Sequence, residues 1–111
     1  MFSPLLIKGT TDILLLKILS VRKEAYGYEL VQLINKESGD VFDFQEGTIY
    51  PLLYRLESQG FVASHRKANL NGKERRYYSL SKEGKDFLEN RSKDLRTHIQ
   101  ALTRILNYKG L

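Results

Sequence analysis

Apolar residues recur at helical spacing in three stretches of the first half of the chain. The first stretch follows Thr10 and is too evenly apolar for an exposed helix, so it predicts a helix buried on most sides. The second runs from about Tyr26 to Ser38, with charged residues opposite its apolar face, and Gly39 ends it. A serine N-cap followed by a proline, at Ser3-Pro4, also predicts a short opening helix.

The third helix is expected to start at or near Thr48 and to end before Gly60. With Thr48 as the N-cap, the missing N–H of Pro51 costs no hydrogen bond, whereas a start at Gly47 would lose one. The apolar residues form a single stripe that comprises Ile49, Leu52, Leu53 and Leu56. The opposite side carries Gly47, Pro51, Tyr54, Arg55 and Ser58, with Thr48 and Tyr50 at the N-terminal end.

After Gly60 the spacing changes from helical to strand-like. Residues 61–67 and 75–80 are rich in Phe, Val, Tyr and Ser, and an Asn-Gly turn at Asn71-Gly72 lies between them, which predicts a β-hairpin. Ser81 then caps a last helix that continues to about Asn107, a length of about 40 Å. This helix has a heptad seam, which comprises Leu88, Ser92, Leu95, Ile99, Leu102 and Leu106.

This order of elements predicts a mainly α fold with a two-stranded β-wing, that is, a winged helix-turn-helix followed by a long C-terminal helix. We expect a DNA-binding domain over residues 1–80 and a dimerisation helix over residues 81–111, packed as one compact unit. A domain of this size cannot cover the whole seam, whereas pairing in a two-fold homodimer would cover it. The expected dimer-interface residues are Leu88, Leu95, Ile99, Leu102 and Leu106.

Composition narrows the possible chemistry. The 111 residues allow one hydrophobic core, and the absence of cysteine excludes disulfides and thiolate chemistry. The chain has no glycine-rich phosphate loop, no HExxH motif and no clustered carboxylates, and His65 and His98 lack metal-ligand spacing, so we expect no enzyme, no metal site and no cofactor. No apolar run is long enough for a signal peptide or a bilayer span, so we expect a cytoplasmic protein, nucleoid-associated when bound to DNA.

Positive charge is concentrated in the predicted hairpin. The formal net charge is +5, and residues 65–76 hold five Lys and Arg against one acid, Glu74. A winged helix places its third helix in the major groove and its wing on the flanking backbone, so we expect double-stranded DNA as the partner. Arg55 is the best candidate for reading guanine, because arginine can pair with that base through two hydrogen bonds. The alternatives for Arg55 are contact with phosphate and an ion pair on the protein surface near Glu57. The expected DNA-binding residues are Tyr28, Thr48, Tyr50, Tyr54, Arg55, Arg66, Lys67, Lys73, Arg75 and Arg76.

Several blocks of residues also carry a family resemblance. They are Lys8-Gly9-Thr10-Thr11-Asp12, Tyr26-Gly27-Tyr28-Glu29-Leu30, Glu46-Gly47-Thr48-Ile49-Tyr50-Pro51, Leu53-Tyr54-Arg55-Leu56-Glu57, and Gly72-Lys73 with Arg75-Arg76-Tyr77-Tyr78. In this order they resemble the PadR family of bacterial transcriptional regulators, specifically its short members with a single C-terminal helix. The resemblance implies a cytoplasmic dimeric repressor, often of its own gene and of neighbouring detoxification or transport genes.

The resemblance also bears on individual residues. It implies that Tyr28, Thr48, Tyr50, Arg55 and the hairpin cations contact DNA, and it makes Pro51 an ordinary part of the recognition helix. The C-terminal helix departs from the family in having no tryptophan. This absence argues against a flat aromatic ligand stacked between indoles at the dimer interface.

Other functions stay open at this point. A protein-binding winged helix would need an apolar or acidic third helix and would not need a basic wing, the reverse of this sequence, whereas charge alone does not separate DNA from RNA. A dimer would present its recognition helices to an inverted-repeat operator. A small-molecule effector between the C-terminal helices and the first helix would alter that spacing, although no residue set identifies it.

Overall fold

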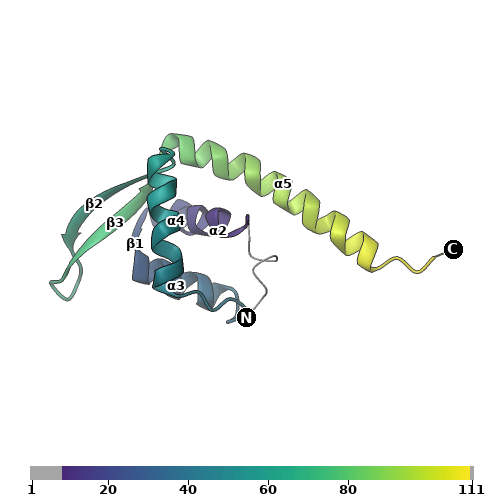
Figure 1. Ribbon diagram of the computed structural model, residues 1–111, viewed down its shortest axis with the longest axis horizontal. Coiled ribbons are helices and arrows are strands. Elements are labelled where there is room, and N and C mark those ends of the chain that lie inside the picture. The colour runs from purple at the N-terminus through teal and green to yellow at the C-terminus, as the bar shows by residue number, and fades with distance from the viewer. Residues whose placement is uncertain (1–8, 111) are drawn as a thin grey trace.

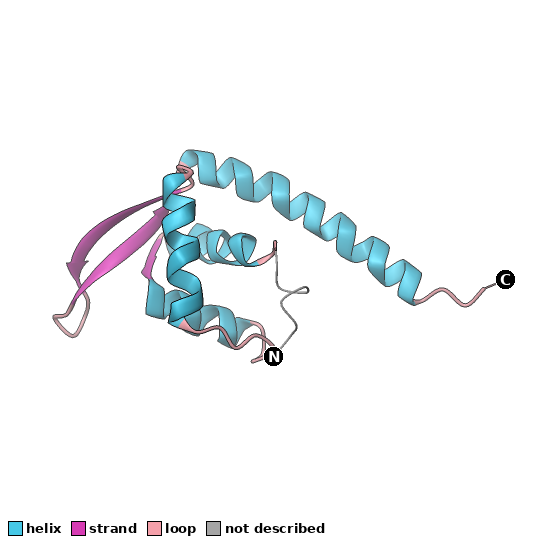
Figure 2. Cartoon of the chain, viewed as in Figure 1, coloured by secondary structure: helices cyan, strands magenta, loops and turns pink. Residues whose placement is uncertain are grey.

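The computed structural model describes residues 9–110, and the opening helix expected at Ser3-Pro4 lies outside them. Figure 1 shows a small body from which one long helix projects. The elements in chain order are α2 (Thr11–Arg22), β1 (Glu24–Tyr26), α3 (Gly27–Glu37), α4 (Glu46–Ser58), β2 (Val62–Ala68), β3 (Glu74–Leu80) and α5 (Lys82–Leu106). The expected fold class, mainly α with a β-wing and a long last helix, is confirmed (Figure 2).

The sheet has three strands, one more than the two expected. The strands are antiparallel in the order β1-β3-β2, and β1 pairs with the second half of β3. Tyr26, expected as the start of a helix, is instead the last residue of β1 and the N-cap of α3. A strand of three residues has too few positions to show an alternating pattern, which is why periodicity missed it.

The third helix expected from the sequence, α4, begins earlier than predicted. Gln45 is the N-cap of α4, not Thr48, so Pro51 lies inside the helix. The missing N–H of Pro51 would have bonded to the carbonyl of Gly47. Because Gly47 is exposed, water can bond to that carbonyl, and the early start therefore costs little.

The turn between α3 and α4 is held by Asn35. Its Nδ2 donates to the carbonyl of Phe44 at 3.0 Å, and the backbone N–H of Phe44 donates to its Oδ1 at 2.8 Å. Phe44 is buried, so this pair of bonds fixes the linker at the point where it enters the core. The start of α4 is thereby set relative to α3, as a helix-turn-helix requires.

One core joins α2, α3, α4 and the sheet. Fully buried side chains from these elements include Leu15, Leu16, Leu30, Ile49, Leu53, Leu56 and Tyr78. Burial, and next the nearby Glu57 carboxylate, raises the pKa of Tyr78 to about 12. Because these apolar stripes face inward, the opposite face of α4 and the tip of the hairpin remain open to solvent.

The last helix is attached to the body over its first turns. The side chain of Ser81 accepts a bond from the N–H of Gly84 at 2.9 Å, as expected of an N-cap. A Cβ at Gly84 would lie 2.1 Å from the carbonyl oxygen of Phe61, so only glycine allows this approach. Phe87 stacks on Phe61 with ring centroids 4.3 Å apart, and Leu88 completes the contact.

Beyond Leu88, α5 extends away from the body, and the described chain measures 62 × 29 × 21 Å (Figure 1). Among residues 9–110, no helix combines the length and hydrophobicity needed to cross a membrane.

Candidate nucleic-acid interface

The exposed face of α4 is polar and aromatic. Ile49, Leu53 and Leu56 turn inward, whereas Thr48 and Tyr54 are exposed, Tyr54 by 55% of its surface. Exposed hydroxyls and an accessible helix N-terminus can donate to phosphate oxygens. This face is therefore suited to a DNA groove, as the sequence predicts.

Tyr50 is less free than Tyr54. Its ring packs on the backbone of Gly27 at the start of α3, where an added Cβ would lie 2.6 Å from Cζ of the ring. Its hydroxyl donates to Oε2 of Glu46 at 3.2 Å. Burial, and next the Glu46 carboxylate, raises the pKa of Tyr50. Tyr50 thus joins α3 to α4, and Gly27 makes room for its ring, a packing role that the sequence does not reveal.

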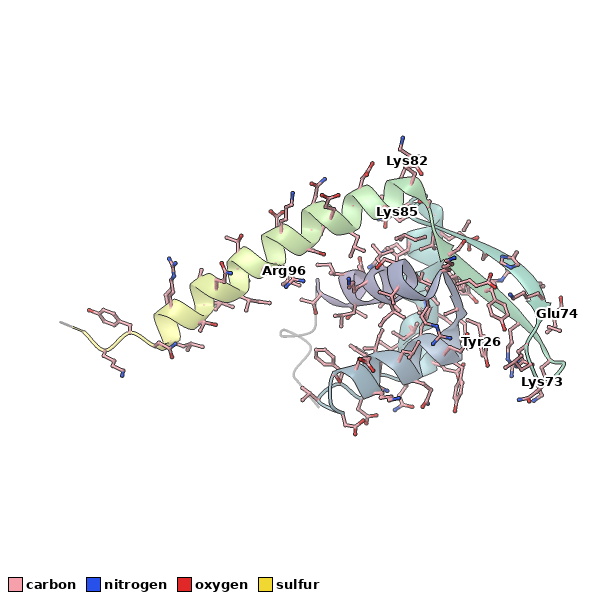
Figure 3. All side chains as sticks on the ribbon, turned by 180° about the vertical axis from the view of Figure 1, so that it is seen from behind. Tyr26, Lys73, Glu74, Lys82, Lys85 and Arg96 are labelled. Carbon is pink, nitrogen blue, oxygen red and sulfur yellow. The ribbon has the colours of Figure 1, made fainter. Side chains whose placement is uncertain are left out.

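A polar hollow of about 440 Å³ separates the wing tip from the starts of α3 and α4. Its lining combines tyrosines, amides and cations: Tyr26, Tyr28, Glu46, Tyr50, Asn69, Asn71, Lys73 and Arg75. The guanidinium carbon of Arg75 lies 5.8 Å from the ring centroid of Tyr26. Figure 3 shows Lys73 at the wing tip and Tyr26 closer to the helices. Tyr28, half exposed, lies at the same hollow, so the structure brings these predicted residues together.

The wing tip is a loop over residues 69–73. Asn69 organises it, because its Oδ1 accepts from the backbone N–H groups of Asn71 and Lys73 at 3.0 and 2.9 Å. The expected turn at Asn71-Gly72 lies within the loop, and Gly72 has φ +80°. The side chain of Lys73 is consequently carried on an ordered tip.

The strand register divides the wing cations between two faces. Arg66 lies directly opposite Arg76, and Lys67 directly opposite Arg75. Like charges directly opposite each other on neighbouring strands repel, and a phosphate placed between them would relieve the repulsion. Arg76 is partly held, because it donates to Oγ of Ser64 at 3.0 Å and Ser64 donates to Glu57 of α4 at 2.6 Å.

Lys67 is held within the protein. Its Nζ donates to Oε1 of Glu24 on β1 and lies 4.5 Å from the ring centroid of Tyr77. This hydrogen bond raises the pKa of Lys67 and lowers that of Glu24. In contrast, Arg66 and Lys73 are exposed and make no ion pair within residues 9–110. The predicted wing cations therefore include free ones and one, Lys67, that already has a counterion.

We expect Lys67→Ala to leave the salt dependence of DNA binding unchanged and Arg66→Ala to lower its slope by about 0.9, because only a cation that meets phosphate displaces a counterion from DNA. Fluorescence anisotropy titrations at four salt concentrations measure the slope. Glu24→Gln is the matched control, since it frees Lys67 and should raise the slope. Equal losses for Lys67→Ala and Arg66→Ala would show that Lys67 leaves Glu24 to bind DNA.

Arg55 also has a partner within the chain. Its Nη2 lies 2.9 and 3.0 Å from the two carboxylate oxygens of Asp12, at the first turn of α2. The prediction that Arg55 reads guanine is not tested by this contact, but the ion pair gives Arg55 a role within the chain, and we do not propose it as the residue that reads a base.

The heptad seam of α5 is buried at its start and exposed farther along the helix. Leu88 is buried in the core of its own chain, with 8% of its surface exposed, so we drop it from the expected dimer interface. Leu95 is half-buried, whereas the later seam residues are open to solvent: Ile99 by 51%, Leu102 by 48% and Leu106 by 83%. Ile105 and Tyr108, which the heptad spacing passed over, are also exposed.

Known proteins match this chain over most of its length. The profile of the Transcriptional regulator PadR-like family matches residues 15–90. A PadR-like transcriptional regulator from Bacillus cereus is 30% identical, with a TM-score of 0.82 over 95% of this chain and 99% of that one. A PadR family transcription regulator from Clostridium difficile is 35% identical, with a TM-score of 0.75 over 89% of this chain and 100% of the other.

An uncharacterized protein of Lysinibacillus sphaericus is 29% identical over 89 residues, which are 80% of this chain and 81% of the relative. The family match runs from Leu15 in α2 to the first turns of α5 and includes the open face of α4 and the wing. The chain belongs to the PadR-like family of transcriptional regulators, and it is a DNA-binding regulator with a winged-helix fold, not an enzyme.

Proposed function

We propose that the protein is a homodimeric repressor that binds an inverted-repeat operator. One observation carries this proposal: the chain exposes a polar α4 face beside free wing cations at one end, and a row of exposed apolar side chains on α5 at the other. Two copies joined through α5 would present two α4 helices related by a two-fold axis. Such a pair matches an inverted repeat whose half-sites lie about one helical turn apart.

The parts of the molecule have different tasks in this proposal. The wing cations Arg66, Lys73, Arg75 and Arg76 supply affinity for any phosphate backbone, together with Tyr28 at the hollow. The open face of α4 enters the groove, where it contacts DNA through Thr48, Tyr50 and Tyr54. Residues 1–80 are then the DNA-binding part and residues 81–111 the dimerising part, in a cytoplasmic protein that joins the nucleoid when it binds.

We extend the proposal to release of DNA by a small molecule bound between α2 and α5. A hollow of about 370 Å³ separates them, with Ile13 and Leu95 as apolar walls and Arg91, Asp94 and His98 as polar ones. A ligand there would shift α5 and so change the spacing of the recognition helices. A compound that bound at this hollow and left DNA affinity unchanged would contradict this extension.

Selection of bound fragments from the host genome, followed by a reporter assay, tests the function. We expect enriched fragments to share an inverted repeat, and deletion of the gene to raise transcription from promoters that contain it. Enrichment of single half-sites would contradict the dimeric operator, and lower transcription after deletion would show an activator. Tighter binding to RNA of the same length would favour the RNA-binding alternative, and no preference for nucleic acid would favour a protein-binding module.

A further inference from the structure

The ion pair between Arg55 and Asp12 connects two helices that are distant in the sequence. Arg55 lies in the last turn of α4 and Asp12 in the first turn of α2, 43 residues away. Each charge also suits its own helix end, because cations stabilise a C-terminus and anions an N-terminus. The Arg55 side chain is 52% exposed and that of Asp12 25%, so the pair is open enough to form and break without unfolding the core.

Arg55 does not point the same way as Tyr50. At about 100° per residue, Arg55 lies about 140° around α4 from Tyr50, which faces the wing and Gly27. The opposite flank of α4, where Arg55 lies, faces α2. Both carboxylate contacts use Nη2, which would have to leave Asp12 before it could bind a base edge.

The same end of α4 lies beside the start of α5, because the backbone N–H of Ser81 donates to the carbonyl of Phe61 at 3.0 Å. Phe61 follows α4 directly, stacks on Phe87 of α5, and receives the backbone of Gly84 against its carbonyl. A hollow at this junction is lined by α2, by α5 and by the segment that follows α4: Gly9, Asp12, Ile13, Gln59, Phe61, Phe87 and Arg91. The ion pair and the aromatic stack therefore fix α2, α4 and α5 to one another at a single junction.

We propose that Arg55 is a positioning residue: its ion pair with Asp12 sets the angle between α4 and α5, and with it the half-site spacing that the dimer accepts. The inference rests on the proposed dimeric function. Rigid attachment of α4 to α5 is what converts dimer geometry into a fixed distance between two recognition helices. Loss of the ion pair would leave each half-site contact intact while loosening that distance.

Selection from a random DNA library, read by sequencing, separates positioning from base reading because it reports base preference and spacing independently. The variants are Asp12→Asn, Arg55→Gln and the double variant. Arg22→Gln is the matched control, because it removes an ion pair of similar exposure, with Glu29, at the other end of α2. Thermal denaturation of each variant reports stability separately.

We expect both single variants to keep the wild-type half-site and to lose about fivefold of the preference for one spacing, at the lower end of typical coupling between sites. The double variant should lose no more than either single, and Arg22→Gln should lose nothing. A purely stabilising role would lower the melting temperature and leave the spacing unchanged, which would overturn the proposal.

Base reading by Arg55 would also overturn it. In that case Arg55→Gln would lose one guanine preference within the half-site, and Asp12→Asn, which frees the arginine, would not. The wild-type result separates a failure of the proposed dimeric function from a failure of the positioning role alone. Wild-type enrichment of single half-sites would overturn the dimeric function and the positioning role with it, whereas paired half-sites with unchanged variants would overturn the positioning role alone.

Discussion

Replacing Ile99 and Leu102 with aspartate is expected to give a monomer that binds its operator about 100-fold more weakly or worse. Both side chains project from α5 with about half their surface exposed, Ile99 by 51% and Leu102 by 48%. A carboxylate buried in an apolar dimer seam without a partner is strongly unfavourable, so the pair of copies would separate. A monomer then loses the gain of two linked binding sites, which is typically 100-fold to 10,000-fold.

Sedimentation velocity measures the oligomeric state, and anisotropy with operator DNA measures the affinity. Thr97→Asp with Gln100→Asp is the matched control, because it adds the same charge to exposed positions on the far side of α5. The control should stay dimeric with unchanged affinity, and both variants should keep their helical circular dichroism. A dimer that persists in the Ile99 and Leu102 variant would place the interface elsewhere.

Most of the fold could be predicted because its elements are specified by residues that are close in the sequence. The apolar stripe of α4, the strand-like spacing of the hairpin and the Ser81 cap each depend on residues within one or two turns. The predictions that were wrong concern elements whose presence or bounds depend on tertiary contacts or on solvent. β1 exists because β3 offers it an edge, and α4 starts early because solvent can satisfy the carbonyl that Pro51 leaves free.

The candidate site was predicted less completely, for a related reason. The sequence identifies which side chains are cationic, but the register decides that Lys67 meets Glu24 and that Arg66 faces Arg76. Arg55 and Asp12 are likewise 43 residues apart, and no local pattern joins them. Gly27 is part of a recognisable motif, but the requirement for glycine there comes from the ring of Tyr50, which packs on its backbone. That contact depends on how α3 and α4 pack, which the sequence does not show.

Neutralising two cations at the wing tip is the other change with a large expected effect. Lys73→Ala with Arg75→Ala should weaken binding to operator and unrelated DNA alike, on the order of tenfold per lost phosphate contact at 0.1 M salt. The slope of log affinity against log salt should fall by about two, since each contact contributes about 0.9. Both residues line the hollow beside Tyr28 and Tyr50, where a backbone phosphate would meet them.

The double variant Lys82→Ala with Lys85→Ala tests whether the loss of DNA affinity comes from the position of the removed cations or from the lower net charge. These two lysines are exposed at the start of α5, at the opposite end of the hairpin from its tip, and their loss changes the net charge by the same amount (Figure 3). A general charge effect would lower affinity equally in both double variants. A contact effect would lower it in the wing variant alone, and would leave the ratio of operator to unrelated DNA nearly constant, because phosphates carry no sequence information. A fall in that ratio after Lys73→Ala with Arg75→Ala would mean instead that the wing reads bases.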